Sequence, residues 1–339
     1  MLAAGVDFEQ IEPVNTPAMR ACHALTEAGS PVDHPHLPAL SFEGFKNWWF
    51  HGDDRQESWL ARDDSGEPVG CYQLVLPERE NRAMAFGGLF VAPARRRAGA
   101  GTAMLAHCVA QAREAGRVGL ASTGAVRTKV RDGSAGAAFA AARGAATGLA
   151  EVIRIQEITP VLLKRLAAVR AEAKSHAAGY EFVSWTGSTP DVHLEQVALV
   201  NSAMSDAPRD SGVEPEIVDA ERIRAAEQSA LANGVHLYSV AARQPATGVF
   251  VALTQLSMYA GTEDWASQGD TVVRPQDRGH RLGILVKFAM LDLLTRHEPG
   301  IRYILTGNAQ SNTHMAAINE RLGYQVADAY RSWELDLTT

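Results

Sequence analysis

Two copies of an Arg-x-x-x-x-Gly pattern are the part of this sequence best suited to binding a phosphate-rich ligand. One copy, RGHRLG, runs from Arg278 to Gly283, and a looser one, RRAGAG, runs from Arg96 to Gly101, 182 residues earlier. Each follows an apolar run that ends in valine and precedes a helical pattern. A strand that ends in such a loop and opens a helix gathers unpaired backbone N–H groups at the positive end of the helix dipole. The pattern therefore predicts two pyrophosphate sites.

The repeat extends beyond these loops. Trp59 matches Tyr238, and Gly144 matches Gly323, each pair being 179 residues apart. A nearly constant offset over most of the chain predicts a tandem duplication, because chance matches would scatter. We expect a first unit at residues 1–157, a connecting helix at 158–178 and a second unit at 179–339.

Hydrophobic periodicity predicts the same order of elements in both units: a strand, two helices, three strands, the loop with its helix, a strand, a short helix and a final strand. The apolar stripe after Gly283 is the clearest helical signal in the chain. Two polar segments, 124–137 and 205–218, are predicted to be loops, and the second, which is acidic, is a candidate substrate loop.

The first loop fits V-x-P-x-x-[RQ]-x-x-G-x-[GA] and the second fits it in part, and on this motif the chain resembles the GNAT acetyltransferase superfamily. Arg96, Gly99 and Gly101 match it directly, whereas in the second copy Arg281 stands in the place of the first motif glycine. The resemblance covers most of the 339 residues. It implies an α/β fold of two tandem GNAT domains, each with a mixed sheet in which strands four and five splay apart around acyl-CoA.

By this resemblance, backbone amides of the loop hold the pyrophosphate of coenzyme A, and the basic motif residue fixes the loop. In a stretch similar to the family's fifth strand and fourth helix, Asn308 would bind backbone or pantetheine groups at the splay and Asn312 would contact coenzyme A; the alternative is that both are cap or turn residues. The implied cofactor-binding residues are Val273, Arg278, Gly279, His280, Arg281, Leu282, Gly283, Asn308, Asn312, Arg96, Arg97, Gly99 and Gly101.

The implied acid–base residues differ between the two units. The family usually has a tyrosine that protonates the departing thiolate, but Asn319 holds that place here and Ala140 holds it in the first unit. An amide has no titratable proton to give. Asp270, on the predicted fourth strand, is the candidate general base, and Gly88 is its counterpart. Asp270 could also be a solvent-facing strand residue, and Asp206 and Glu214 of the acidic loop are rival bases.

The resemblance implies transfer of an acetyl or short acyl group from acyl-CoA, as cosubstrate, to the amine of a small molecule. We expect catalysis in the C-terminal unit by direct attack, with an N-terminal unit that is degenerate but able to bind coenzyme A. The tandem arrangement is similar to that of mycothiol synthase, whose tyrosine motif is missing here. Two alternatives are a non-catalytic acyl-CoA-binding regulator and an enzyme that works through its N-terminal unit.

Composition is consistent with a folded protein and excludes several classes. The formal net charge of −7 and the lack of basic blocks outside ARRR argue against nucleic acid. The three cysteines lack metal-ligand spacing, so no metal is expected. We expect a cytoplasmic monomer or homodimer with no membrane partner, since neither a signal peptide nor a run of 18 apolar residues is present.

Overall fold

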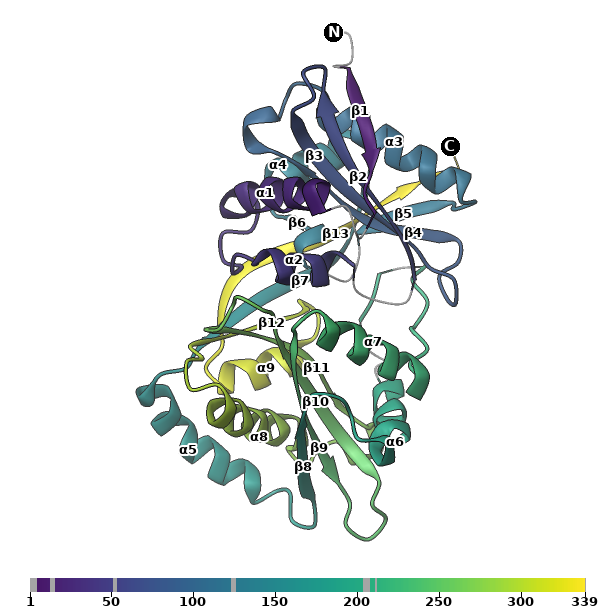
Figure 1. Ribbon diagram of the computed structural model, residues 1–339. Coiled ribbons are helices and arrows are strands. Elements are labelled where there is room, and N and C mark those ends of the chain that lie inside the picture. Colours follow the sequence, from purple (N-terminus) through teal and green to yellow (C-terminus); the bar gives the residue numbers. More distant parts are fainter. Residues whose placement is uncertain are drawn as a thin grey trace.

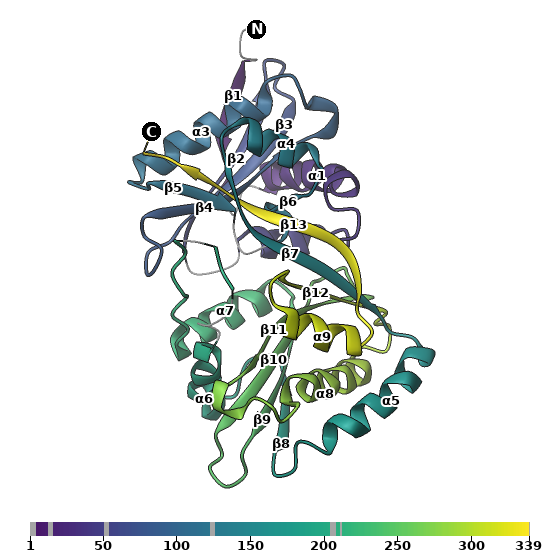
Figure 2. The same ribbon diagram turned by 180° about the vertical axis from the view of Figure 1, so that it is seen from behind.

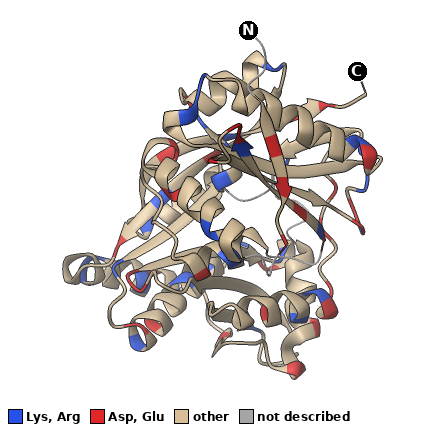
Figure 3. Cartoon of the chain, turned by 45° about the horizontal axis from the view of Figure 1, so that its top comes forward, with Lys and Arg blue, Asp and Glu red and all other residues tan. Residues whose placement is uncertain are grey.

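A computed structural model describes residues 5–12, 16–50, 54–122, 126–203, 208–210 and 212–338. The chain forms two lobes stacked one on the other, with both ends of the chain in the N-terminal lobe (Figure 1). Basic and acidic residues alternate along the ribbon of both lobes (Figure 3). None of the helices in the described ranges is long and apolar enough to cross a membrane.

Each half of the chain runs through the same succession of elements. The N-terminal half comprises β1 (Val6–Gln10), α1 (Thr16–Asp33), α2 (Phe42–Trp49), β2 (Arg55–Asp63), β3 (Pro68–Leu76), β4 (Met84–Val91), α3 (Ala100–Glu114), β5 (Gly119–Ser122), β6 (Val130–Arg131), α4 (Ala135–Ala142) and β7 (Ala146–Glu157). The linker helix is α5 (Pro160–Lys174), where Thr159 is the N-cap and Pro160 occupies the first turn.

The C-terminal half repeats this order with one short strand fewer. It comprises β8 (Glu181–Thr186), α6 (Asp191–Asn201), α7 (Ala220–Ala232), β9 (His236–Arg243), β10 (Phe250–Met258), β11 (Trp265–Val273), α8 (Leu282–His297), β12 (Tyr303–Ala309), α9 (Thr313–Arg321) and β13 (Gln325–Asp336). The elements predicted from periodicity are all present, with ends that differ by a few residues.

All these strands join one continuous sheet, in which the two halves exchange their last strands. The order is β1-β2-β3-β4-β5-β13-β7-β12-β11-β10-β9-β8, with β6 pairing to β13. Strand β7, from the N-terminal half, pairs with β12, while β13, from the C-terminal half, pairs with β5. The two long strands cross the junction side by side (Figure 2). Neither half therefore completes its own sheet.

Helices cover both faces of the sheet in each half. In the N-terminal half, α1 and α2 pack one face through Met19, Phe45 and Trp49, and α3 packs the other through Met104 and Cys108. In the C-terminal half, α5 and α8 cover one face and α6 and α7 the other. This layering leaves the carboxyl ends of β4 and β11 facing the N-termini of α3 and α8.

The segment 124–137 is more ordered than the predicted loop in its described part. Residues Val126–Thr128 form a 3-10 turn, β6 pairs with β13, and α4 begins at Ala135. The two strand residues of β6 find their partner about 200 positions later, so no local pattern could have indicated this strand.

Candidate functional site

The two predicted pyrophosphate loops have the same backbone conformation. In each, two residues adopt positive φ: Arg97 (66°) and Gly99 (97°) in the first loop, and Gly279 (90°) and Arg281 (57°) in the second. Gly99 and Arg281 are the N-caps of α3 and α8, with no side-chain capping bond. The glycine and the arginine have exchanged places between two otherwise equivalent loops. Both loops thus aim the free N–H groups of a helix start at the splayed strands.

The motif arginine fastens each loop to the strand before it. Arg96 Nε donates to the Val91 carbonyl oxygen at 3.0 Å, and its two terminal nitrogens bind the Asp33 carboxylate at 3.1 and 2.6 Å. Arg278 Nε likewise donates to the Val273 carbonyl oxygen at 3.3 Å. These arginines shape the loop from within, because the Nε of each donates to the strand that precedes the loop.

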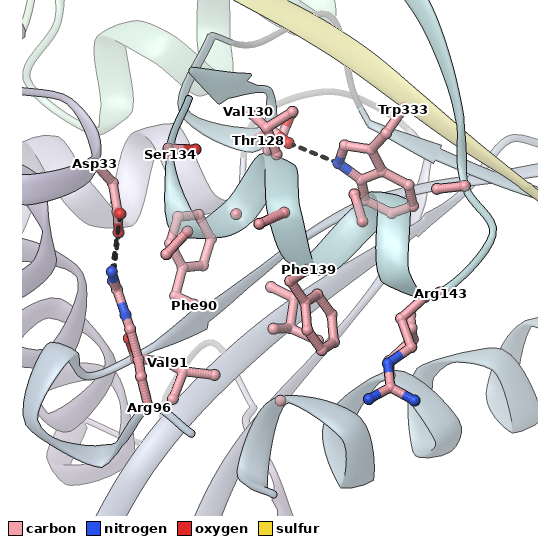
Figure 4. A pocket seen from close by; sticks show the side chains of 18 of the residues that line it. Asp33, Phe90, Val91, Arg96, Thr128, Val130, Ser134, Phe139, Arg143 and Trp333 are labelled. Carbon is pink, nitrogen blue, oxygen red and sulfur yellow. Dashed lines mark hydrogen bonds and ion pairs between the residues drawn. The ribbon is translucent and has the colours of Figure 1, made fainter. Parts of the chain in front are cut away.

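A cavity of about 470 Å³ opens beside the N-terminal loop, within the size range of small-molecule sites (Figure 4). Thr102 and Leu105 of α3, Phe139 of α4, and Val91 and Trp333 line it on several sides. Its cationic lining residues are Arg96, Arg97, Arg127, Lys129, Arg131 and Arg143. Arg96, Lys129 and Arg131 form ion pairs with Asp33, Glu151 and Asp328, so the positive charge offered to a polyanionic ligand comes mainly from the other three cations.

The cavity lies where β4 and β5 separate. Their parallel pairing runs from Met84↔Gly119 to Gly87↔Ser122, and Leu89, Phe90 and Val91, which follow on β4, line the cavity. The exchanged strand β13 supplies Trp333, whose Nε1 donates to the Thr128 carbonyl oxygen at 3.1 Å. The C-terminal end of the chain therefore forms part of the wall of the N-terminal cavity.

The fourth strand of the C-terminal half, β11, has a bulge that β4 lacks. Between Thr254↔Thr271 and Leu256↔Gln268 the register shifts, so Gly269 and Asp270 oppose the single residue Gln255. Asp270 is exposed, yet the surrounding protein desolvates its carboxyl enough to raise its pKa. Bulges next to active sites redirect strand residues, and this one leaves Asp270 unpaired beside the splay.

A chain of buried polar side chains runs from the exchanged strand β7 through β12 to α9 and α8. Lys287 Nζ donates to Asn319 Oδ1 (3.0 Å), Asn319 Nδ2 donates to Asn308 Oδ1 (3.3 Å), and the same oxygen accepts from Arg154 (2.8 Å). The four residues come from α8, α9, β12 and the exchanged strand β7, and each is at most 9% exposed. Burial lowers the pKa of Lys287 to about 7. We call these four side chains the Lys287 network.

Three matched positions distinguish the halves. Where the C-terminal half has Asp270, Lys287 and Asn319, the N-terminal half has Gly88, Leu105 and Ala140. The N-terminal half thus has a basic cavity but no acid–base group at these three positions. The C-terminal half has a carboxylate, an amine and an amide there.

A second cavity of about 460 Å³ lies on the α7 face of the C-terminal sheet. It extends from Arg222 and Glu227 of α7 across Tyr238 and Ser257 to Gly269 of the β11 bulge. Asn47 of α2 also lines it, so the cavity is shared by the two halves. It approaches the bulge from the face opposite α8.

Several predicted residues serve the scaffold. Asn312 is the N-cap of α9, its Oδ1 accepting from Met315 N at 3.1 Å, as its alternative interpretation had it. His280 is exposed and packs near the Tyr180 ring. Glu214 accepts from the backbone N–H of Asn81 at 2.7 Å and thereby joins the acidic loop to the N-terminal half. Asp206 lies outside the described residues.

Sequence reasoning missed Lys287 and the residues that line the inner part of the N-terminal cavity. His34 is buried there, and desolvation lowers its pKa to about 4, so its imidazole is neutral at physiological pH. Arg127 lines the same cavity and lies 5.9 Å from the Trp48 ring. The only local signal for Lys287 was a lysine within the apolar stripe of α8.

Comparisons with known proteins agree with this architecture. Residues 19–129 match the model of the acetyltransferase (GNAT) family. A tandem GNAT protein from the clavulanic acid biosynthesis pathway superposes with a TM-score of 0.81 at 26% identity, covering 99% of both chains. A GCN5-related N-acetyltransferase from Sphaerobacter thermophilus gives a TM-score of 0.68 at 16% identity, covering 98% of this chain and 96% of that one.

A search of curated proteins finds no match. The family match lies in the N-terminal half, while the structural match spans both halves, including the exchanged strands. Together with the two equivalent loops, these findings show a tandem GNAT fold, in which the α/β acetyltransferase architecture is built twice in one polypeptide and the N-terminal half matches the family model.

Proposed function

We propose that this protein transfers an acetyl or short acyl group from acyl-CoA to the amine of a small molecule. The observation that supports this best is the pair of equivalent loops, each placing a helix N-terminus beside splayed strands. In the N-terminal half this arrangement adjoins the basic cavity. Oriented N–H groups and arginines complement the diphosphate and the 3′-phosphate of coenzyme A.

Within this proposal the halves have unequal roles. Each half binds acyl-CoA at its own loop; the N-terminal half does so without turnover, and the C-terminal half carries out the transfer, with Asp270 as the base. The contrast between Asp270, Asn319 and their counterparts Gly88 and Ala140 favours this division. The second cavity gives the amine a route to the bulge from the face opposite the pyrophosphate loop. Holding amine and thioester together would supply much of the rate by proximity.

An N-terminal working half is the second candidate, and the basic cavity is the observation that favours it. Catalysis there would rely on proximity and on the neutral His34, because Gly88 and Ala140 offer no proton-transferring group. The two candidates differ in which loop controls turnover.

Free-thiol release from acetyl-CoA, measured against a panel of small amines, tests the function. Calorimetry of Gly101→Val and Gly283→Val then separates the halves, because a branched side chain obstructs the approach of a diphosphate to the helix start. We expect each variant to lose one binding site and Gly283→Val to lose turnover.

The matched controls are Gly101→Ala and Gly283→Ala. A Cβ at Gly283 would lie 3.3 Å from Ile318 Cδ1 and one at Gly101 3.5 Å from Phe139 Cε2, so a single methyl needs little adjustment. Thiol release that survives Gly283→Val but disappears in Gly101→Val would establish the N-terminal candidate. No thiol release with any amine, despite tight acetyl-CoA binding, would favour a regulator.

A further inference from the structure

The Lys287 network surrounds the place where the family usually has a tyrosine. Asn319 holds the tyrosine's place and is fully buried, with Lys287 on one side and Asn308 on the other. In the N-terminal half the corresponding residues are Ala140 and Leu105, which cannot form such a pair.

The two cations at the ends of the network determine how both amides are oriented. In their charged forms, lysine and arginine side chains have only donors. Asn319 must therefore turn its Oδ1 toward Lys287, and Asn308 must turn its Oδ1 toward Arg154. The group of Asn319 that faces Asn308 is then its Nδ2, which donates one proton to Asn308 Oδ1. A second Nδ2 proton remains on Asn319.

Asn308 places this end of the network at the splay. The parallel pairing of β11 with β12 ends at Gln268↔Thr306, and Asn308 follows two residues later on β12. Asp270 follows two residues after Gln268 on β11. The candidate base and the Lys287 network thus lie on the two strands that diverge around the place where a pantetheine arm would thread.

We propose that Asn319 stabilises the departing coenzyme A thiolate as a hydrogen-bond donor, and that Lys287 is the positioning residue that holds the amide in this orientation. This inference rests on the proposed acyl transfer in the C-terminal half. It supplies a role for the residue that stands where a proton donor is usual.

The acyl transfer needs no side-chain acid. The amine nitrogen attacks the thioester carbonyl carbon, forming the C–N bond, and the tetrahedral intermediate collapses as the C–S bond breaks. The electron pair of that bond stays on sulfur as a thiolate, which accepts a hydrogen bond from Asn319 Nδ2. The nitrogen proton passes to the Asp270 carboxylate, and the released thiolate is later protonated by water.

The charge on Lys287 strengthens this donor, because an ammonium bound to an amide oxygen polarises the amide N–H. Burial is the cause that lowers the pKa of Lys287 to about 7. The other titratable or charged groups facing it are Tyr324, whose ring lies 5.3 Å from Nζ, and Arg154 of β7, which reaches it through the two amides. Turnover should therefore weaken as the pH rises through about 7.

The test compares Lys287→Met, which removes donor and charge, with Lys287→Gln, which keeps an N–H donor for Asn319 Oδ1 but cannot titrate. With acetyl-CoA and the best amine of the panel, we expect Lys287→Met to lower kcat about 10- to 100-fold with little change in KM. Lys287→Gln, which like the neutral lysine has a donor but no charge, should recover only part of the activity that Lys287→Met loses, and both variants should lose the decline above pH 7. Lys174→Met, an exposed lysine on α5, is the control and should match the wild type.

A double-mutant cycle with Asn319→Leu completes the test. If the pair acts as one unit, the double variant Lys287→Met/Asn319→Leu should lose no more than the worse single variant. Additive losses in the double variant, or an unchanged pH profile in Lys287→Gln, would overturn the inference. So would single variants that keep the wild-type kcat but bind one more coenzyme A, because the network would then only block a binding site. A wild-type enzyme that releases no thiol would instead overturn the proposed function.

Discussion

Gly99 and Arg281 lie 182 residues apart, and both begin a helix in the left-handed conformation, with φ of 97° and 57°. Two positions before them, Arg97 and Gly279 also have positive φ, with the arginine and the glycine in the opposite order. Each loop therefore contains one glycine and one arginine at positive φ. A left-handed non-glycine residue costs about 1–2 kcal/mol. Each half accepts this cost at a different position and arrives at the same loop.

Stability should report this backbone requirement in the C-terminal loop. Gly279 has φ of 90° with open space around it, so Gly279→Ala meets no clash and its cost is conformational. We expect a loss of about 1–2 kcal/mol in the free energy of unfolding, measured by urea denaturation. Gly300→Ala is the control, because Gly300 has neither a positive φ nor a near neighbour and should be neutral or slightly stabilising.

Loss of the arginine that fastens each loop should affect turnover unequally. If the C-terminal half is the working half, Arg278→Ala should lower kcat/KM by about one to two decades, the usual cost of a charge-assisted contact, and Arg96→Ala should lower it much less. Steady-state kinetics with acetyl-CoA would measure both. Equal or reversed effects would place catalysis in both halves or in the N-terminal half.

The pH dependence should identify the base. Desolvation raises the pKa of Asp270, so the ionised, active form is lost as the pH falls through that raised value. We expect the low-pH limb of the kcat/KM profile to lie above the range of an ordinary aspartate. In Asp270→Asn the rate should fall about 10²- to 10⁴-fold, and this limb should disappear. A fully active Asp270→Asn enzyme would leave the base to a water held on the strand.

Lys287 should also leave a signature in stability. Its pKa is about 7 in the folded chain and near 10.5 when unfolded, so between these values the unfolded chain binds more protons. The contribution of Lys287 to the free energy of unfolding therefore rises as the pH increases from about 7 to 10. Thermal melts across this range should show the wild type gaining stability relative to Lys287→Met. Parallel curves for the two proteins would contradict a desolvated lysine.

The exchanged strands predict that the halves fold together. A chain ending at Tyr324 lacks β13, which exposes the edges of β5 and β7 and removes Trp333 from the N-terminal cavity. Exposed edges favour aggregation. We expect loss of solubility and of N-terminal coenzyme A binding, assayed by light scattering and calorimetry. A fragment of residues 1–157 that is monomeric, folded and able to bind coenzyme A would refute this dependence.

The sequence alone determined the local features of this protein. Each glycine–arginine loop, like the apolar stripe of α8, depends on residues within about 20 positions of one another. The repeat was found by comparing such short segments between the two halves. Helix periodicity and loop chemistry are properties of such short segments. Together with the resemblance to the GNAT superfamily, they were enough to predict the tandem fold and to place Asp270 on a strand and Asn319 on a helix.

Only the tertiary structure decided what joins distant segments. Three connections join residues that are mostly more than 100 positions apart. They are the pairing of β13 with β5, the hydrogen bond between Glu214 and Asn81, and the Lys287 network. Strand register and buried hydrogen bonds depend on which faces meet after folding, and many pairings fit the same local pattern. In the sequence, Lys287 is a single lysine within the apolar stripe of α8. Only folding places it against Asn319, which stands where the family usually has its proton-donating tyrosine.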